Sequence, residues 1–152
     1  MAKFDALDQK ILALLQRECD LPLDLIGERV GLSRNAVWRR VKALEAAGVI
    51  KARVALLDPD SVGLGLTVFM MIRTDRHAPD WLDRFAAATR DMPEILGAYR
   101  MTGDLDYLIR ARVGDVKSYD RLYQNLVARI ELADVSASFV MEEIKETTVL
   151  PV

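Results

Sequence analysis

The sequence has very little of the residues that form disulfides and metal sites, with one cysteine (Cys19) and one histidine (His77) among 152 residues. A single cysteine cannot form a disulfide within the chain, and no cluster of cysteine and histidine indicates a metal site. The longest largely apolar run, 64–72, is far shorter than the roughly 20 residues that span a bilayer. The first residues also lack the apolar core of a signal peptide. We therefore expect a cytoplasmic protein with no membrane segment, no metal and no other cofactor.

Patterns typical of enzymes are also missing. The sequence contains no Ser-His-Asp set, no glycine-rich phosphate loop and no metal-ligand spacing. His77 stands alone in a predicted loop before Pro79, where a surface position is favoured over a catalytic one. The sequence therefore predicts no catalytic residues and a protein that is not an enzyme.

Apolar residues make up 51% of the chain, which is enough to bury a real core. The net charge of −2 is unevenly distributed: residues 33–53 carry a net charge of +5, whereas residues 61–152 carry −3. A local basic patch on a mildly acidic body is what contact with phosphates requires. This evidence is weak when taken alone, because many solvated helices are equally basic.

The first third of the chain has the pattern of three helices. Apolar spacing predicts a helix over Asp5–Glu18, a second that begins near Pro22 and ends at Gly31, and a third from the N-cap Ser33 to Ala47. A tight Gly-Leu-Ser turn between the second and third helices is typical of a helix-turn-helix. We therefore predict a helix-turn-helix DNA-binding domain over residues 1–50 and an extended linker over 51–63.

The remainder, residues 64–152, alternates strands and helices. The expected elements are strands over 66–74, 95–102, 105–113 and 135–141 and helices over 80–92 and 116–130. The order β-α-β-β-α-β is that of a ferredoxin-like fold, so the fold class is α+β. Helices cover one face of such a sheet, yet both alternating sets within 67–72 are largely apolar. The second face should therefore be buried by packing sheet on sheet in a dimer.

The third predicted helix carries the candidate contacts with double-stranded DNA, because its first turns enter the major groove in a helix-turn-helix. Arginine can form two hydrogen bonds with guanine, and asparagine can do so with adenine. Trp38 either lies on DNA sugars or packs against the first helix, and the polar residues could instead simply solvate an exposed face. The expected DNA contacts are Ser33, Arg34, Asn35, Trp38, Arg39, Arg40 and Lys42.

A second candidate site is the segment 103–107 (Gly-Asp-Leu-Asp-Tyr), which joins two predicted strands. Backbone N–H groups beside Gly103 could bind the carboxylate of an amino acid, and Asp104 or Asp106 could bind its ammonium group. An ordinary β-turn would contain the same residues, and the chemistry alone does not decide between the two.

Together these segments resemble the Lrp/AsnC (feast/famine) family of transcriptional regulators over essentially the whole chain. The likeness rests on several ordered motifs at the family's spacing, namely 8–15, 30–33, 40–42, 44–45, 48–50, 102–107, 141–145 and 147–151. It implies a winged-type helix-turn-helix followed by a ferredoxin-like domain, in homodimers that assemble further into tetramers or octamers.

The resemblance also implies an amino-acid effector bound between subunits near the Gly-Asp turn. The effector contacts that it implies are Gly103, Asp104, Asp106, Ser136 and Ser138. The family often has threonine at the last two positions, so the serines here alter the shape of the pocket. Segments 12–16, 54–59 and 62–67, with Trp38, resemble the cysteine-responsive members, which makes L-cysteine the expected effector.

The predicted function is that of a sequence-specific DNA-binding transcriptional regulator that responds to an amino acid. One alternative is an architectural DNA-binding protein without a ligand. A second is an enzyme, since some tetrapyrrole decarboxylases resemble this family in both domains. Those enzymes depend on histidines, and a chain whose only histidine is His77 fits them poorly.

Overall fold

The computed structural model describes residues 4–75 and 79–152, so His77 lies outside the described residues. The chain divides into two compact units. Met1–Leu56 together with Lys145–Val152 form the first, which we call the helical unit, and Leu57–Ile144 form the second, the sheet unit.

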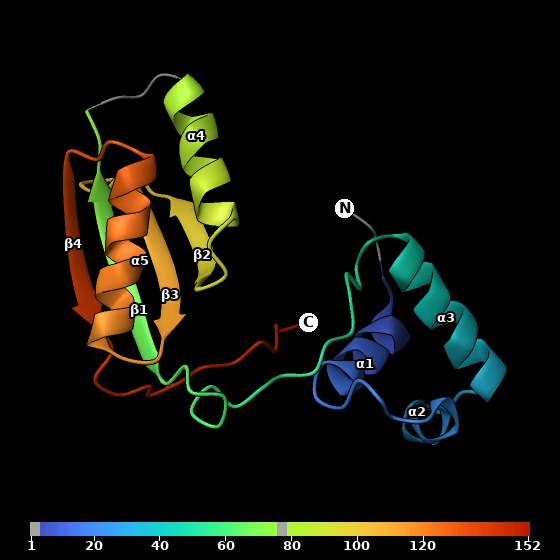
Figure 1. The fold of residues 1–152 in the computed structure, drawn as a ribbon. Coiled ribbons are helices and arrows are strands. Elements are labelled where there is room, and N and C mark those ends of the chain that lie inside the picture. Colours follow the sequence, from blue (N-terminus) through green and yellow to red (C-terminus); the bar gives the residue numbers. More distant parts are fainter. Residues whose placement is uncertain (1–3, 76–78) are drawn as a thin grey trace. The chain divides into compact units, whose positions relative to one another are not determined.

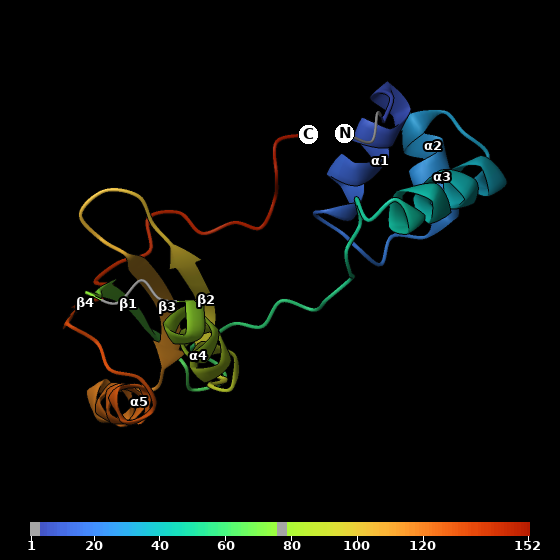
Figure 2. The same ribbon diagram turned by 90° about the horizontal axis from the view of Figure 1, so that it is seen from above.

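The helical unit contains α1 (Ala6–Leu15), α2 (Leu23–Val30) and α3 (Arg34–Ala46), and α3 contacts both other helices (Figures 1 and 2). Its core is apolar, and Ile11, Ile26 and Val37 have no solvent-exposed surface. These residues belong to the apolar sets whose helical spacing predicted the three helices. One helix alone of this length would be marginal in water, so packing of the three apolar faces is what stabilises them.

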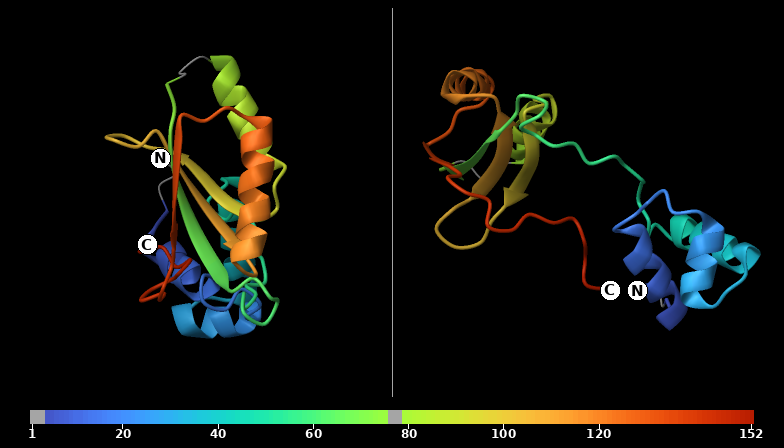
Figure 3. Two further views of the ribbon diagram at one scale, coloured as in Figure 1. Left: turned by 60° about the vertical axis from the view of Figure 1, so that its left-hand side comes forward. Right: turned by 90° about the horizontal axis from the view of Figure 1, so that it is seen from below.

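The sheet unit contains β1 (Leu66–Arg73), α4 (Pro79–Arg90), β2 (Ile95–Arg100), β3 (Tyr107–Val113), α5 (Val116–Arg129) and β4 (Asp134–Phe139). Its sheet has the order β2-β3-β1-β4, and every neighbouring pair is antiparallel. Both helices lie on one face of the sheet (Figures 1 and 3). The predicted ferredoxin-like α+β fold is thereby confirmed.

The core of the sheet unit lies between the sheet and its two helices. Val68, Met70 and Ile72 alternate along β1 and are fully buried. Against them packs an aromatic cluster in which the ring centroids of Trp81 and Phe85 lie 5.2 Å apart. Burial of each such side chain contributes about 1.5–3 kcal/mol.

The other face of the sheet, which we call the open face, carries no helix. Phe69 and Met71 of β1 lie on it and are half-buried within the chain. Strand register places Leu108 opposite Met71 and Arg110 opposite Phe69. The open face therefore carries the apolar side chains of Phe69, Met71 and Leu108, as the alternation in 67–72 predicted, with Arg110 in the middle of β3 directly opposite Phe69.

Two segments connect the units. Residues 47–65 form turns and irregular chain, and no strand precedes β1 in the described part of the protein. The C-terminal tail, 145–152, belongs to the helical unit, although the sequence had placed 64–152 in a single domain. Two hydrogen bonds join this tail to Gln16, the C-cap of α1: Gln16 Nε2 donates to the Leu150 carbonyl at 3.1 Å, and the Leu150 N–H donates to Gln16 Oε1 at 2.6 Å.

Candidate nucleic-acid interface and effector turn

The turn between α2 and α3 is tight and rests on backbone hydrogen bonds. Gly31 ends α2 in the left-handed conformation, and the Leu32 N–H donates to the Gly27 carbonyl at 2.9 Å. Gly27 lies so close to the Leu32 carbonyl that any side chain there would collide with it. Ser33 then caps α3, accepting a hydrogen bond from the Ala36 N–H at 3.3 Å. The predicted cap is confirmed, and the turn fixes how α3 leaves α2.

The two sides of α3 differ sharply in burial. Val37, Val41 and Leu44 are at most 5% exposed and face the core. The predicted contacts on the opposite side are all exposed: Arg34, Asn35, Trp38, Arg39 and Lys42. Trp38 is 51% exposed, so it does not fill the core, and it remains available to a ligand.

Most cations of this face have weak partners. Arg34 Nε lies 3.7 Å from Asp24 Oδ2, and both side chains are about two-thirds exposed. Lys42 donates to Glu45 at 2.7 Å, and this hydrogen bond lowers the pKa of the Glu45 carboxyl. Exposed pairs of this kind contribute about 0–1 kcal/mol. A DNA phosphate could therefore replace either carboxylate at little cost.

Arg40 differs from the other predicted contacts. Its Nη1 donates to Asp5 Oδ2 and to Asp8 Oδ1, each at 2.8 Å, and its side chain is 30% exposed. These hydrogen bonds raise the pKa of Arg40. Sequence reasoning missed this network, although the Asp5–Asp8 spacing is a recognisable capping signal at the start of α1.

The effector turn, residues 101–106, is fixed to the end of β1. Asp106 Oδ2 accepts the Thr74 N–H at 2.8 Å, and Arg73 Nε donates to the Asp104 carbonyl at 3.1 Å. Gly103 has a φ of +94°, which favours glycine at the tip. Asp104 is exposed, whereas Asp106 is half-buried and directed toward its own backbone partner. The exposed groups for a ligand are thus Gly103 and Asp104.

Ser136 and Ser138 lie on β4, opposite Met71 and Phe69, so they face the open side of the sheet. Strand β1 separates them from β3 and the turn. The structure of one chain therefore brings Gly103, Asp104 and Asp106 together but does not place the two serines beside them.

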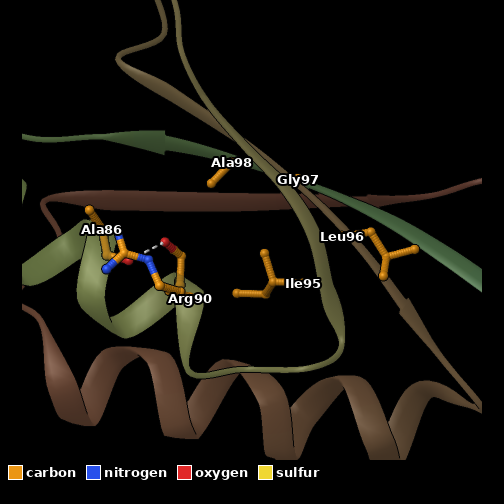
Figure 4. Close-up of a pocket in the computed structure, with 7 residues that line it drawn as sticks. Ala86, Arg90, Ile95, Leu96, Gly97 and Ala98 are labelled. Atoms are coloured by element: carbon orange, nitrogen blue, oxygen red, sulfur yellow. Dashed lines mark hydrogen bonds between the residues drawn. The ribbon is translucent and has the colours of Figure 1, made fainter. Parts of the chain in front are cut away.

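Two shallow cavities of the sheet unit are lined by other residues. One, of about 320 Å³, lies between α4 and β2, and Figure 4 shows that Ile95 and Leu96 point to opposite sides of that strand. The other, of about 420 Å³, lies between the end of α5 and β4 and includes Tyr123, Asp134 and Val135. Neither contains a predicted effector contact.

Within 4–75 and 79–152, no group of three or more His, Cys, Asp or Glu side chains is placed to hold a metal ion. The described helices include none that is both long and apolar enough to cross a membrane.

The helical unit thus has the form of a helix-turn-helix DNA-binding domain, and the sheet unit forms a separate α+β domain. Comparison with known proteins agrees. Residues 4–51 match the family model "Winged helix-turn-helix DNA-binding", and residues 67–150 match "Lrp/AsnC ligand binding domain".

Curated relatives match over the full length. The chain is 51% identical to the glutamate uptake regulatory protein of Zymomonas mobilis, over 98% of this chain and 91% of that protein. It is 48% identical to the DNA-binding transcriptional activator DecR of Escherichia coli, over 97% and 98% of the two chains.

Among solved structures, an AsnC family transcriptional regulator from Agrobacterium tumefaciens matches with a TM-score of 0.95 at 47% identity, over 97% of both chains. A transcriptional regulator from Neisseria meningitidis in complex with L-Met matches with a TM-score of 0.93 at 39% identity, over 98% of this chain and 97% of that one. The chain belongs to the Lrp/AsnC family of DNA-binding transcriptional regulators.

Proposed function

We propose that α3 binds the major groove of an operator, with Arg34, Asn35 and Arg39 on base edges and Ser33, Trp38 and Lys42 on the sugar-phosphate backbone. The exposed polar face of α3, opposite a fully buried apolar face, is the observation that carries this proposal. In this proposal the protein acts in the cytoplasm as a regulator and not as an enzyme.

Two arginine variants and a charge control test the interface. A duplex is selected from a random pool by the wild-type protein, and its affinity is measured by fluorescence anisotropy. Arg34→Ala and Arg39→Ala should each weaken binding about 5- to 150-fold, because a bidentate contact with a base is worth about 1–3 kcal/mol. Lys117→Ala removes one positive charge from α5 and should leave the affinity unchanged. Wild-type affinity in both arginine variants would contradict the assignment.

The open face of the sheet is the proposed dimer interface. It carries three neighbouring apolar side chains, Phe69, Met71 and Leu108, which packing against a second copy would remove from water. Tetramers or octamers would be built from these dimers. Met71→Asp should shift the protein toward monomers in sedimentation velocity, whereas Leu82→Asp, on the exposed side of α4, should not. Dimers that persist in Met71→Asp at micromolar concentration would contradict this interface.

An amino acid is the proposed effector, bound where the turn of one subunit meets another subunit. Backbone groups at Gly103 would bind the ligand's carboxylate, and the exposed Asp104 its ammonium group. Asp106 Oδ2 is already hydrogen-bonded to Thr74, so Asp106 would act mainly by holding the turn. Because β1 separates Ser136 and Ser138 from the turn of their own chain, these serines would come from the neighbouring subunit.

L-Cysteine is the proposed ligand, from the sequence likeness to cysteine-responsive members. The L-Met complex of the Neisseria relative supports a sulfur-containing amino acid as the class. A thermal-shift screen against the twenty amino acids, with cysteine kept reduced, tests this. At a hundredfold excess over Kd, a ligand stabilises the folded state by about 2.7 kcal/mol. A shift with cysteine alone supports the proposal; a shift with another amino acid refutes cysteine. A screen with no shift favours the architectural role.

A further inference from the structure

The first turn of α1 and the middle of α3 are joined by a three-residue charged network. Asp5 is the N-cap of α1, and its Oδ1 accepts the N–H groups of Leu7 and Asp8, each at 2.9 Å. Asp8 returns the contact, since its Oδ2 accepts the Asp5 N–H at 3.1 Å. The other oxygen of each carboxylate accepts from Arg40. Each aspartate therefore caps α1 with one oxygen and binds α3 with the other.

The position of Arg40 on α3 directs it away from the exposed polar face. Successive helix residues are about 100° apart, so Arg40 lies on the flank beside Val37 and Val41. Arg39 and Asn35 lie near the centre of the opposite, exposed side. Arg40 thus faces α1, while its neighbour Arg39 faces outward.

The charge balance of the network also disfavours a phosphate contact. Two carboxylates surround one guanidinium, so the cluster has a net charge of −1 and would repel a phosphate. Asp8 is only 15% exposed, and turning Arg40 toward DNA would leave this carboxylate without its cation. By contrast, Arg34 and Lys42 each have a single, more exposed carboxylate partner.

We propose that Arg40 is a positioning residue for DNA binding: it fixes the direction of the recognition helix against α1 through Asp5 and Asp8, and it does not contact a phosphate. This inference rests on α3 being the DNA-binding helix. It removes Arg40 from the set of direct contacts that the sequence predicted and assigns a DNA-binding role to two acidic residues.

Salt dependence of operator binding separates the two roles. Each phosphate contact contributes about −0.9 to the slope of log affinity against log salt concentration. Arg40→Met should weaken binding about tenfold, equivalent to about 1.4 kcal/mol, with the wild-type slope. Lys42→Met is the matched control, because a lysine on phosphate should reduce the slope by about 0.9. Circular dichroism melts establish that each variant is folded at the assay temperature.

The two possible roles of Arg40 predict opposite changes in operator affinity for Asp8→Asn. If Arg40 bound phosphate, loss of a competing negative charge would strengthen binding. If Arg40 positions α3, Asp8→Asn should weaken binding, and Asp8→Asn combined with Arg40→Met should be no weaker than Arg40→Met alone. Such non-additivity is the signature of residues that act through one contact.

Two results would overturn the inference: a salt slope reduced by about 0.9 in Arg40→Met, or tighter binding by Asp8→Asn. Failure of the interface itself has a different signature, namely wild-type affinity and slope in both Arg39→Ala and Lys42→Met. The experiments therefore distinguish a wrong role for Arg40 from a wrong DNA-binding helix.

Discussion

Replacing Asp106 with alanine should destabilise the sheet unit even when no effector is present. The Asp106 carboxylate accepts the Thr74 N–H at 2.8 Å, and the Asp106 main chain bonds Ile72 and Met101 on either side. The side chain is thus the link between the effector turn and the end of β1. Its loss removes a hydrogen bond with a charged acceptor, which is worth about 1.5–3 kcal/mol.

The expected change in melting temperature follows from this value. For a domain of 60–100 residues, 1 kcal/mol corresponds to about 4–8 °C, so a loss of about 2 kcal/mol lowers the melting temperature by about 8–16 °C. Trp81 reports this transition, because it is 3% exposed and lies 5.3 Å from the ring of Tyr107, next to the turn. Melting is followed by fluorescence in a Trp38→Phe background, which leaves Trp81 as the only tryptophan.

Two further variants control the measurement. Asp106→Asn keeps an acceptor without the charge and should lose about half as much stability. Asp104→Ala removes an exposed carboxylate and should stay within about 0.5 kcal/mol of wild type. A melting temperature of Asp106→Ala within about 2 °C of the parent would refute the structural role of this carboxylate.

Three other perturbations have expected outcomes. Gly27→Ala should unfold or distort the helix-turn-helix and abolish operator binding, because a methyl group there overlaps the Leu32 carbonyl; wild-type binding would show that the turn has room. Met70→Ala, at a fully buried position, should cost about 2–5 kcal/mol in denaturant unfolding; a loss below about 1 kcal/mol would mean that the core relaxes around the cavity. Hydrogen bonds lower the pKa of Asp5, chiefly from the Asp8 N–H, and of Asp115, chiefly from Ser118. Their stabilising contribution is therefore present above the ordinary carboxyl pKa of about 3.9 and is lost as the pH falls through the lower, folded-state pKa. Unfolding midpoints should fall on acidification below about pH 4, and less steeply in Asp115→Asn; equal slopes would contradict this.

The elements of this fold could be predicted because their signals are local. Val37, Val41 and Leu44 have the spacing of one helical face, and all three are at most 5% exposed. Residues 116–130 were expected as a helix, and α5 spans Val116–Arg129. Boundaries were less accurate at the strands: β2 ends at Arg100, two residues before the predicted end, where the chain turns toward Gly103.

Contacts between distant residues could not be predicted in this way. Arg40 was predicted as a DNA contact, and its hydrogen bonds to Asp8 and Asp5 could not be foreseen because these partners are 32 and 35 residues away in the sequence. In the sequence, Asp106 looked equivalent to Asp104. The structure shows that the Asp106 carboxylate accepts the Thr74 N–H and holds the turn, whereas the Asp104 carboxylate is exposed. The effector contacts are the least accessible to such reasoning, because the proposed pocket needs more than one subunit.

The hydrogen-bonded tail has a practical consequence for work on this protein. Since 145–152 belong with residues 1–56, the sheet unit is in effect inserted into the helical unit. An N-terminal fragment that stops at the linker would lack Leu150, the hydrogen-bond partner of Gln16. A C-terminal truncation meant to shorten the sheet unit would remove residues of the helical unit instead. An affinity tag added after Val152 would lie two residues from that contact, beside the end of α1. Operator binding is therefore better measured on protein that carries no tag after Val152.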